Sequence, residues 1–152
     1  MTAVTELRVL PSLELTFPNG LPGMQRVNRL RLEPLGNTAN VFGRLVASGR
    51  VEVGEHVLEA LTLVVAAPGL LWPDYSVEVD DETETLLELE DPSDAAALVV
   101  VSLAESLAAC TANLFAPIVL NVRNGLAAQV VPRRSESDTG WPLRAPIPHG
   151  AS

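Results

Sequence analysis

The chain has 152 residues and a formal net charge of −9; 47% of its residues are hydrophobic, 19% charged and 4% aromatic. This length predicts one domain with a sizeable core, and the apolar content excludes a disordered chain. The longest aliphatic run, 95–101, is far shorter than the roughly 20 residues of a membrane-spanning helix. A single cysteine and an N-terminus without a secretory pattern lead us to expect a cytoplasmic protein without membrane contacts.

The first predicted element is a strand that runs into a rigid turn. Apolar and polar residues alternate over Leu13–Phe17, which is the period of a half-buried strand. The segment 17–23, FPNGLPG, then combines two prolines that fix φ with two glycines that permit positive φ. It therefore predicts a sharply folded turn, in which Phe17, Gly20 and Gly23 are the structural residues.

Further strands are predicted in the middle of the chain from alternating or β-branched apolar residues. These strands cover 27–35, 41–47, 60–67, 75–79 and 97–103. The segment 51–58 fits neither a helical nor a strand period. Asp81–Leu87 predicts a short helical turn with Asp81 as the N-cap, and Pro92 predicts a second one at 91–94.

The clearest local signal is a hairpin near the end of the chain. Two β-rich segments, 118–123 and 126–131, flank the dipeptide Asn124-Gly125. This pattern predicts a type I′ turn, which needs positive φ at both central residues. Asn124 and Gly125 are therefore expected turn residues.

The number of short strands and of Gly/Pro corners predicts the fold class. We expect an all-β protein, a mainly antiparallel small β-barrel or sandwich with one or two short helical turns. A single β-barrel-like domain should cover 1–141, and a Pro-rich, mobile tail should follow over 142–152.

The charges are unevenly distributed along the chain. Residues 51–122 contain fourteen acidic residues and no basic one, and ten of the acids lie in 74–94. A negative field of this kind repels nucleic acid and attracts basic proteins, so we expect no direct nucleic-acid binding. The acidic segment is either a docking surface for a basic protein or a solvated face that keeps the protein soluble.

Catalytic nucleophiles and bases are scarce. Cys110 follows alanines in an apolar stretch and is interpreted as a small buried residue. His56 is interpreted as a surface or structural residue, and His149 lies in the expected tail, where it could not be held in place. We therefore expect no enzyme and no catalytic residue, although scattered carboxylates leave a hydrolase as a weaker alternative.

Metal and cofactor sites are not expected either. The motif Asp80-x-Glu82-x-Glu84 places acids at alternate positions, as calcium loops do. Such loops also need Gly at the sixth position and Glu at the twelfth, where this chain has Thr85 and Asp91.

Four segments form a distinctive set: FPNGLPG at 17–23, WPDYSVEV at 72–79, TANLFAPIVLN at 111–121 and AQVV at 128–131. In this order they resemble the bacterial flagellar assembly factor W (FliW-like) family. They are similar to the family's F-x-x-G-x-P-G turn, its P-D-Y segment, its T-x-N-L-x-A-P-I-V-I-N signature and its Q-V-V strand. The resemblance spans residues 11–145, and it is weakest between 40 and 72, where residues 49–59 form a longer, Gly-rich connection.

This resemblance implies a function based on the exchange of protein partners. Members of the family bind flagellin, and they also bind the carbon storage regulator, a small RNA-binding repressor of flagellin translation. The expected function is therefore to bind flagellin and, when free, to antagonise a regulator of this type. The rival interpretation is a small-molecule-binding β-barrel.

The acidic segment supplies most of the expected partner contacts, because a protein that binds RNA phosphate should present a basic surface. The expected contact residues are Asp74, Tyr75, Asp80, Asp81, Glu82, Glu84 and Asn113. Leu114, Pro117, Ile118 and Leu120 are interpreted as core or edge packing.

Overall fold

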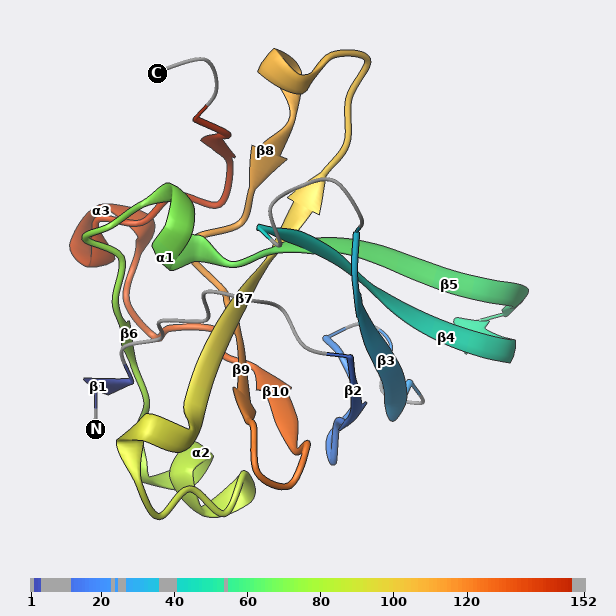
Figure 1. The fold of residues 1–152 in the computed structure, drawn as a ribbon, viewed down its shortest axis with the longest axis horizontal. Coiled ribbons are helices and arrows are strands. Elements are labelled where there is room, and N and C mark those ends of the chain that lie inside the picture. The colour runs from blue at the N-terminus through green and yellow to red at the C-terminus, as the bar shows by residue number, and fades with distance from the viewer. Residues whose placement is uncertain are drawn as a thin grey trace.

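A computed structural model describes residues 2–3, 12–22, 24, 27–35, 41–53 and 55–148, and strands dominate it (Figure 1). The first strands are β1 (Thr2–Ala3), β2 (Leu13–Thr16), β3 (Arg29–Pro34), β4 (Phe42–Val53) and β5 (His56–Ala66). The later strands are β6 (Val77–Glu78), β7 (Ala95–Ser102), β8 (Thr111–Ala112), β9 (Ile118–Asn121), β10 (Ala127–Gln129) and β11 (Ala145–Pro146). Between them lie the α-helices α1 (Pro68–Leu71), α2 (Asp81–Leu86) and α3 (Glu136–Thr139), and the 3-10 turns η1 (Pro92–Asp94) and η2 (Leu107–Ala109).

Nine of these strands form one antiparallel sheet. Its main path runs β10-β9-β7-β5-β4-β3-β2, and β8 pairs with both β7 and β11. β1 and β6 form a separate two-stranded sheet. Within the described residues, Thr16 and Leu126 form a single isolated bridge, but no strand pairing joins β2 to β10 at the two ends of the path. The all-β, mainly antiparallel prediction is confirmed, and the sheet is open rather than closed into a barrel.

Strand β7 lies between two hydrophobic cores. The odd-numbered residues of 95–101 face a core that contains Tyr75, Val77, Val79, Leu87, Leu114 and Ile147, which we call the β6-side core. Ala96 and Leu98 face a second core that contains Leu15, Phe17, Leu30, Leu45, Ile118 and Leu120, which we call the β2-side core. Successive side chains of a strand point to opposite faces, so a strand that is buried on both faces has an uninterrupted run of apolar residues in its sequence, as β7 does.

The ambiguous segment 51–58 lies at the end of the long β4–β5 hairpin, which projects away from the rest of the sheet (Figure 1). The register of this hairpin shifts between Ser48 and Val51. A β-bulge of this kind interrupts the period-two alternation, which explains why the sequence pattern fits no single element.

The helical content exceeds the prediction. Asp80, rather than Asp81, is the N-cap of α2, and η1 lies at the expected second turn. The helices α1 and α3 were not predicted, because each is a single short turn without an apolar period. No helix in the described ranges is long and apolar enough to cross a membrane.

The segment 142–148 differs from the mobile tail expected there. Strand β11 pairs with β8, and Ile147 is buried in the β6-side core. The main-chain N–H groups of Leu114 and Phe115 both donate to the Pro142 carbonyl, at 3.0 and 3.1 Å. Tertiary pairing thus holds a segment whose prolines alone indicated a tail; residues 149–152, including His149, lie outside the described residues.

The β9–β10 hairpin forms as predicted, but its turn does not. Gly125 has φ +80°, whereas Asn124 is not among the described residues with positive φ, so the turn is not type I′. The Asn121 N–H donates to the Leu126 carbonyl at 2.8 Å, so the loop between these two residues has four members, 122–125, and the Gly125 N–H donates back to the Asn121 carbonyl at 2.8 Å. Longer hairpin loops of this kind end with a residue in the left-handed region, and Gly125 supplies it.

The N-terminal turn is described in part. Phe17 is fully buried, and Gly20 has φ +67° with its N–H donating to the Phe17 carbonyl at 3.0 Å. Both observations fit a structural turn, whereas Gly23 lies outside the described residues.

Candidate protein-docking surfaces

The helix α2 concentrates exposed carboxylates at one end of the molecule. Asp80 Oδ1 accepts a hydrogen bond from the Thr83 main-chain N–H at 2.8 Å and thereby caps the helix. This bond holds the pKa of the Asp80 carboxyl below its usual value. Asp81, Glu82 and Glu84 occupy the first turn, where negative charge stabilises the positive end of the helix dipole.

We define the acidic face as Asp80, Asp81, Glu82, Glu84, Glu88 and Glu90. All of these except the half-buried Glu84 are exposed. Among the described residues, neither Asp81 nor Glu82 forms an ion pair within the chain. Their charge is therefore available to a partner.

Two asparagines fix the acidic face to the sheet. The side-chain amide of Asn121 donates to the carbonyls of Leu87 and Glu88, at 3.0 and 3.2 Å, and Asn124 Nδ2 donates to the Leu87 carbonyl at 3.3 Å. Glu88 has φ 55°, an unusual backbone conformation for a residue other than glycine. These bonds hold the turn after α2 in one conformation.

Asn121 is the one buried polar residue among the described part of the chain. Its Oδ1 also accepts from the Arg123 N–H at 2.9 Å, so donor and acceptor are both used. This role of Asn121 could not be predicted from the sequence, because the carbonyl groups that its amide contacts are more than thirty positions away.

The other expected contact residues do not join the acidic face as one cluster. Asp74 is exposed at the corner before β6. Tyr75 is buried: its hydroxyl donates to the Leu114 carbonyl at 2.7 Å, and burial raises the pKa of its phenol above the usual value. Asn113 Oδ1 accepts from the Ala116 N–H at 2.9 Å, which stabilises the turn before β9.

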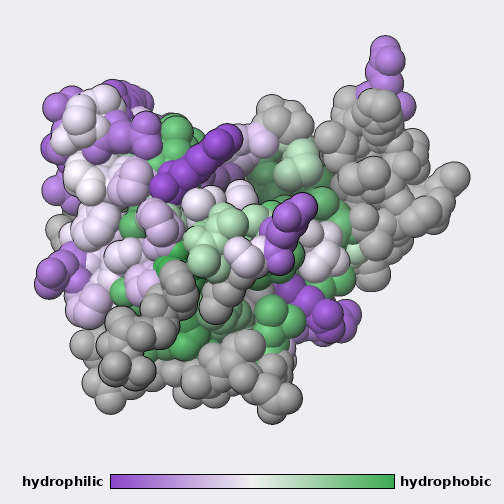
Figure 2. Space-filling view, turned by 90° about the horizontal axis from the view of Figure 1, so that it is seen from above, coloured by the Kyte–Doolittle hydropathy of each residue, from purple (hydrophilic) through white to green (hydrophobic). Residues whose placement is uncertain are grey.

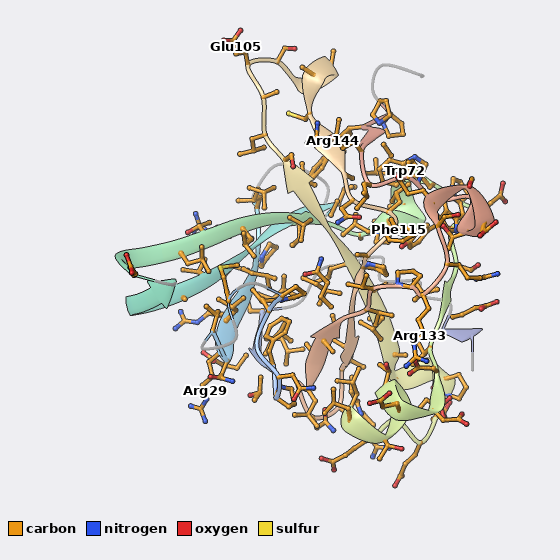
Figure 3. All side chains as sticks on the ribbon, turned by 180° about the vertical axis from the view of Figure 1, so that it is seen from behind. Arg29, Trp72, Glu105, Phe115, Arg133 and Arg144 are labelled. Atoms are coloured by element: carbon orange, nitrogen blue, oxygen red, sulfur yellow. The ribbon has the colours of Figure 1, made fainter. Side chains whose placement is uncertain are left out.

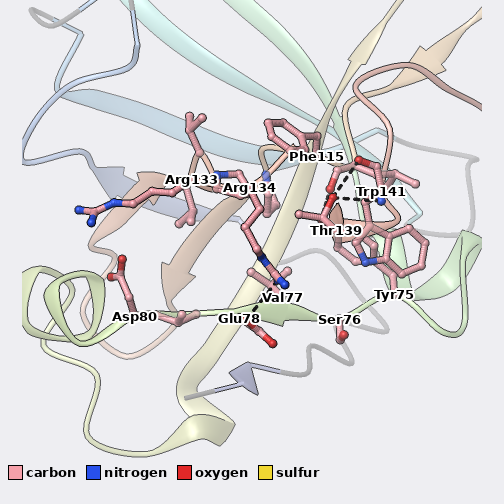
Figure 4. Close-up of a pocket in the computed structure, with 16 residues that line it drawn as sticks. Tyr75, Ser76, Val77, Glu78, Asp80, Phe115, Arg133, Arg134, Thr139 and Trp141 are labelled. Atoms are coloured by element: carbon pink, nitrogen blue, oxygen red, sulfur yellow. Dashed lines mark hydrogen bonds and ion pairs between the residues drawn. The ribbon is translucent and has the colours of Figure 1, made fainter. Parts of the chain in front are cut away.

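A groove of about 620 Å³ lies beside the acidic face (Figure 4). One wall is the extended segment 75–80, which includes β6, and the other is 130–134, which follows β10. Leu114, Phe115 and Pro117 also line it, and Thr139 and Trp141 close it near Tyr75. We call this the β6 groove.

The two ends of the β6 groove differ in character. At one end, the rings of Tyr75 and Trp141 meet edge to face, with centroids 4.8 Å apart. Arg133 lies at the end near α2, whereas Phe115 lies toward α3 (Figure 3). Between the ends, Arg134 Nη2 approaches Glu78 Oε2 at 3.6 Å, an ion pair across the groove (Figure 4).

The basic wall of this groove was not predicted from the sequence. Arg133 and Arg134 are the only adjacent pair of arginines in the chain. Their position directly after the strand expected at 126–131 was the only feature of the sequence that could have indicated a basic wall. Their position opposite the acidic segment depends on how β10 and β6 are brought together, which sequence spacing does not reveal.

The residues considered as possible nucleophiles, bases or metal ligands do not gather in one place. They contain no group of three or more His, Cys, Asp and Glu side chains that could hold a metal ion. Cys110 is buried, and its Sγ lies 3.3 Å from the Ser106 carbonyl and 3.4 Å from the Ala104 N–H, as expected for a packing role. His56 lies in β5, far along the chain from Cys110.

The face of the molecule opposite α2 carries both hydrophilic and hydrophobic residues (Figure 2). Seen from above, hydrophilic residues gather along one side, with hydrophobic residues among them (Figure 2). The exposed large hydrophobic residues of the described chain are Leu70, Leu103, Val131 and Leu143. Val131 is the member of this set that lines the β6 groove.

Sequence comparisons relate the chain to one family. A family model described as FliW protein matches residues 1–147. The chain is 31% identical over 138 residues to the flagellar assembly factor FliW of Bacillus licheniformis, covering 91% of this chain and 90% of that protein. It is 28% identical over 129 residues to the FliW of Bacillus subtilis, covering 85% of this chain and 84% of that protein.

A solved structure shares the fold. The crystal structure of a flagellar assembly factor FliW superimposes with a TM-score of 0.71 at 24% sequence identity. The match covers 97% of this chain and 92% of the other.

Proposed function

The chain belongs to the FliW family of flagellar assembly factors, and we propose that it works by exchanging protein partners. It binds flagellin. When it is free of flagellin, it binds and antagonises an RNA-binding translational repressor of the carbon storage regulator type. This activity needs binding surfaces rather than catalytic groups.

The observation that supports this proposal is the acidic face. A repressor that binds RNA phosphates presents basic residues, because phosphate contacts dominate affinity for nucleic acid. The exposed carboxylates of this face, Asp81 and Glu82 among them, attract such a protein over several ångströms and orient it before contact. The same charge repels RNA, so the factor would bind the repressor without competing for the transcript itself.

The hydrogen bonds that hold the acidic face in one conformation also favour a docking role. Asn121 and Asn124 fix the turn that follows α2, and Asp80 fixes the turn that precedes it. A surface held in place in advance loses less conformational entropy when a partner binds. Plain solubility would not require such anchoring. By contrast, a small-molecule barrel gains no support, because the sheet is open and large apolar side chains fill both cores.

The test begins with purified partners from the same bacterium. We expect the protein to form a stable complex with flagellin and another with the regulator, measured by size-exclusion chromatography and surface plasmon resonance. If neither complex forms, the proposed function is wrong.

Charge reversal then tests the acidic face. The double variant Asp81→Lys/Glu82→Lys leaves the Asp80 cap intact, and we expect its association rate with the regulator to fall several-fold at low salt. The matched control is Glu105→Lys/Asp138→Lys, which changes the net charge equally at exposed positions outside α2. Equal association rates for the two variants would show that the acidic face is not the docking surface.

A further inference from the structure

The β6 groove runs along the edge of a strand rather than over its face. All six residues of 75–80 line it, although successive residues of an extended chain point to opposite sides. The five consecutive residues of 130–134 line the opposite wall. A groove lined by consecutive residues on both walls exposes main chain, and such a slot suits an extended peptide.

The pairing of β6 leaves part of its main chain available. In the described chain, β6 pairs with β1 alone, through Val77 opposite Ala3 and Glu78 opposite Thr2. In an antiparallel pair, adjacent residues direct their N–H and C=O groups to opposite sides. One of Val77 and Glu78 therefore directs both groups away from β1. An added strand can use this residue for hydrogen bonds.

The charges of the groove select the chemistry of the occupant. Arg134 is paired with Glu78, and Asp80 already accepts the hydrogen bond that caps α2. Arg133 is exposed and forms no ion pair with any described carboxylate, so its five guanidinium donors have unused capacity. The complementary group is a carboxylate, which a guanidinium binds in bidentate fashion.

The opposite end of the groove is aromatic. The edge-to-face pair of Tyr75 and Trp141 lies beside Phe115, where an apolar or aromatic side chain gains packing without losing a hydrogen bond. The groove thus combines a main-chain edge, an aromatic end and a cationic end.

We infer that the β6 groove binds an extended segment of flagellin, which adds as a strand beside β6 and places a carboxylate on Arg133. This inference rests on the proposed function, since flagellin is one of its two partners. The basic wall of the groove disfavours the other partner, whose own surface is basic. The two surfaces share Asp80, so flagellin in the groove obstructs the acidic face.

The direct test uses short overlapping synthetic peptides that cover the flagellin sequence. Trp141 reports their binding by fluorescence in a Trp72→Phe background, because Trp72 and Trp141 are the only tryptophans of the chain. We expect binding peptides to contain an acidic residue. N-methylation of single peptide amides should weaken their binding at every second position, as in an added strand. Equal effects at successive positions, or binding peptides without an acid, would overturn the inference.

The variant test separates this inference from the proposed function. We expect Arg133→Glu to weaken the binding of intact flagellin about tenfold. The matched control Arg29→Glu reverses an exposed arginine at the start of β3 and should change the binding less than about twofold. If flagellin binds the wild type and Arg133→Glu equally well, the groove is not its site, and the proposed function stands. If flagellin does not bind the wild type, its role in the proposed function fails, and the inference fails with it.

Discussion

Individual polar side chains fix the geometry of both candidate surfaces. Asn121 joins α2 to the sheet, and Tyr75 joins the start of β6 to the chain before β9 through its bond to the Leu114 carbonyl. Each bond replaces contacts with water inside the protein, where an unpaired polar group would cost about 1–3 kcal/mol. The geometry of both surfaces therefore depends on these buried hydrogen bonds as well as on the exposed residues around them.

Tyr75 gives a prediction about pH at the residue scale. Burial raises the pKa of its phenol in the folded state, so the neutral phenol stabilises the fold fully below the unfolded pKa of about 10. This stabilisation is lost as the pH rises above that value. We expect tyrosinate absorbance, which reports Tyr75 alone because it is the only tyrosine, to increase together with loss of circular dichroism.

The control for this titration is the same protein in denaturant, where tyrosinate should form near pH 10. Ionisation of Tyr75 near that pH in the folded protein, without loss of secondary structure, would contradict the burial of its phenol.

At the scale of elements, the β9–β10 hairpin connects surfaces that are far apart in sequence. Its loop holds α2 through Asn124, and the Gly125 carbonyl accepts a hydrogen bond from Thr16 of β2 at 2.8 Å. Gly125 has φ +80°, and a Cβ atom there would lie 2.5 Å from the Glu14 carbonyl oxygen. Backbone strain and a clash with main chain therefore both oppose any side chain at this position.

We predict that Gly125→Ala lowers the free energy of unfolding by about 2–3 kcal/mol, because the clash with Glu14 adds to the cost of positive φ. Gly140→Ala is the matched control. Its φ is +77°, but no atom lies within 4 Å of the added Cβ, so the loss should be about 1–2 kcal/mol. Urea unfolding measures the free energy of unfolding of both variants. Equal losses of stability would show that the β9–β10 hairpin moves away from β2 at little cost in free energy.

At the scale of the whole molecule, the two cores share β7. Leu98 packs into the β2-side core and Val99 into the β6-side core, and both are fully buried. A strand that belongs to both cores should couple their unfolding, although the sheet itself is open.

We predict that Leu98→Ala lowers the stability by about 2–5 kcal/mol and leaves a single unfolding transition. Circular dichroism should report the same midpoint as the fluorescence of Trp72 and Trp141, which both pack against the β6-side core. Val99→Ala, on the other face of β7, should lower both midpoints as well. A fluorescence midpoint that stays at the wild-type value in Leu98→Ala would show that the two cores unfold independently.

Much of the fold follows from local patterns in the sequence. Alternation over 13–17 and 27–35 predicts β2 and β3, the apolar run at 97–103 predicts β7, and Asn124-Gly125 predicts the position of the last hairpin. These features depend on the period of a strand and on the backbone preferences of glycine and asparagine. The acidity of 74–94 is likewise a property of the sequence alone.

Tertiary contacts decided the rest. The strand at Ala145–Pro146 forms because it pairs with β8, which is distant in sequence. The turn at 122–125 and the N-cap at Asp80 are set by backbone geometry that differs from the local pattern, by turn type in one case and by one residue in the other. The β6 groove exists because 75–80 and 130–134 meet, which no local period specifies. The sequence alone thus determined which residues are acidic and which segments are extended. The packing of β7 between two cores decided which of these segments face each other. The physical reason is that the hydrophobic effect has no preferred direction, so only close packing of particular side chains selects one arrangement.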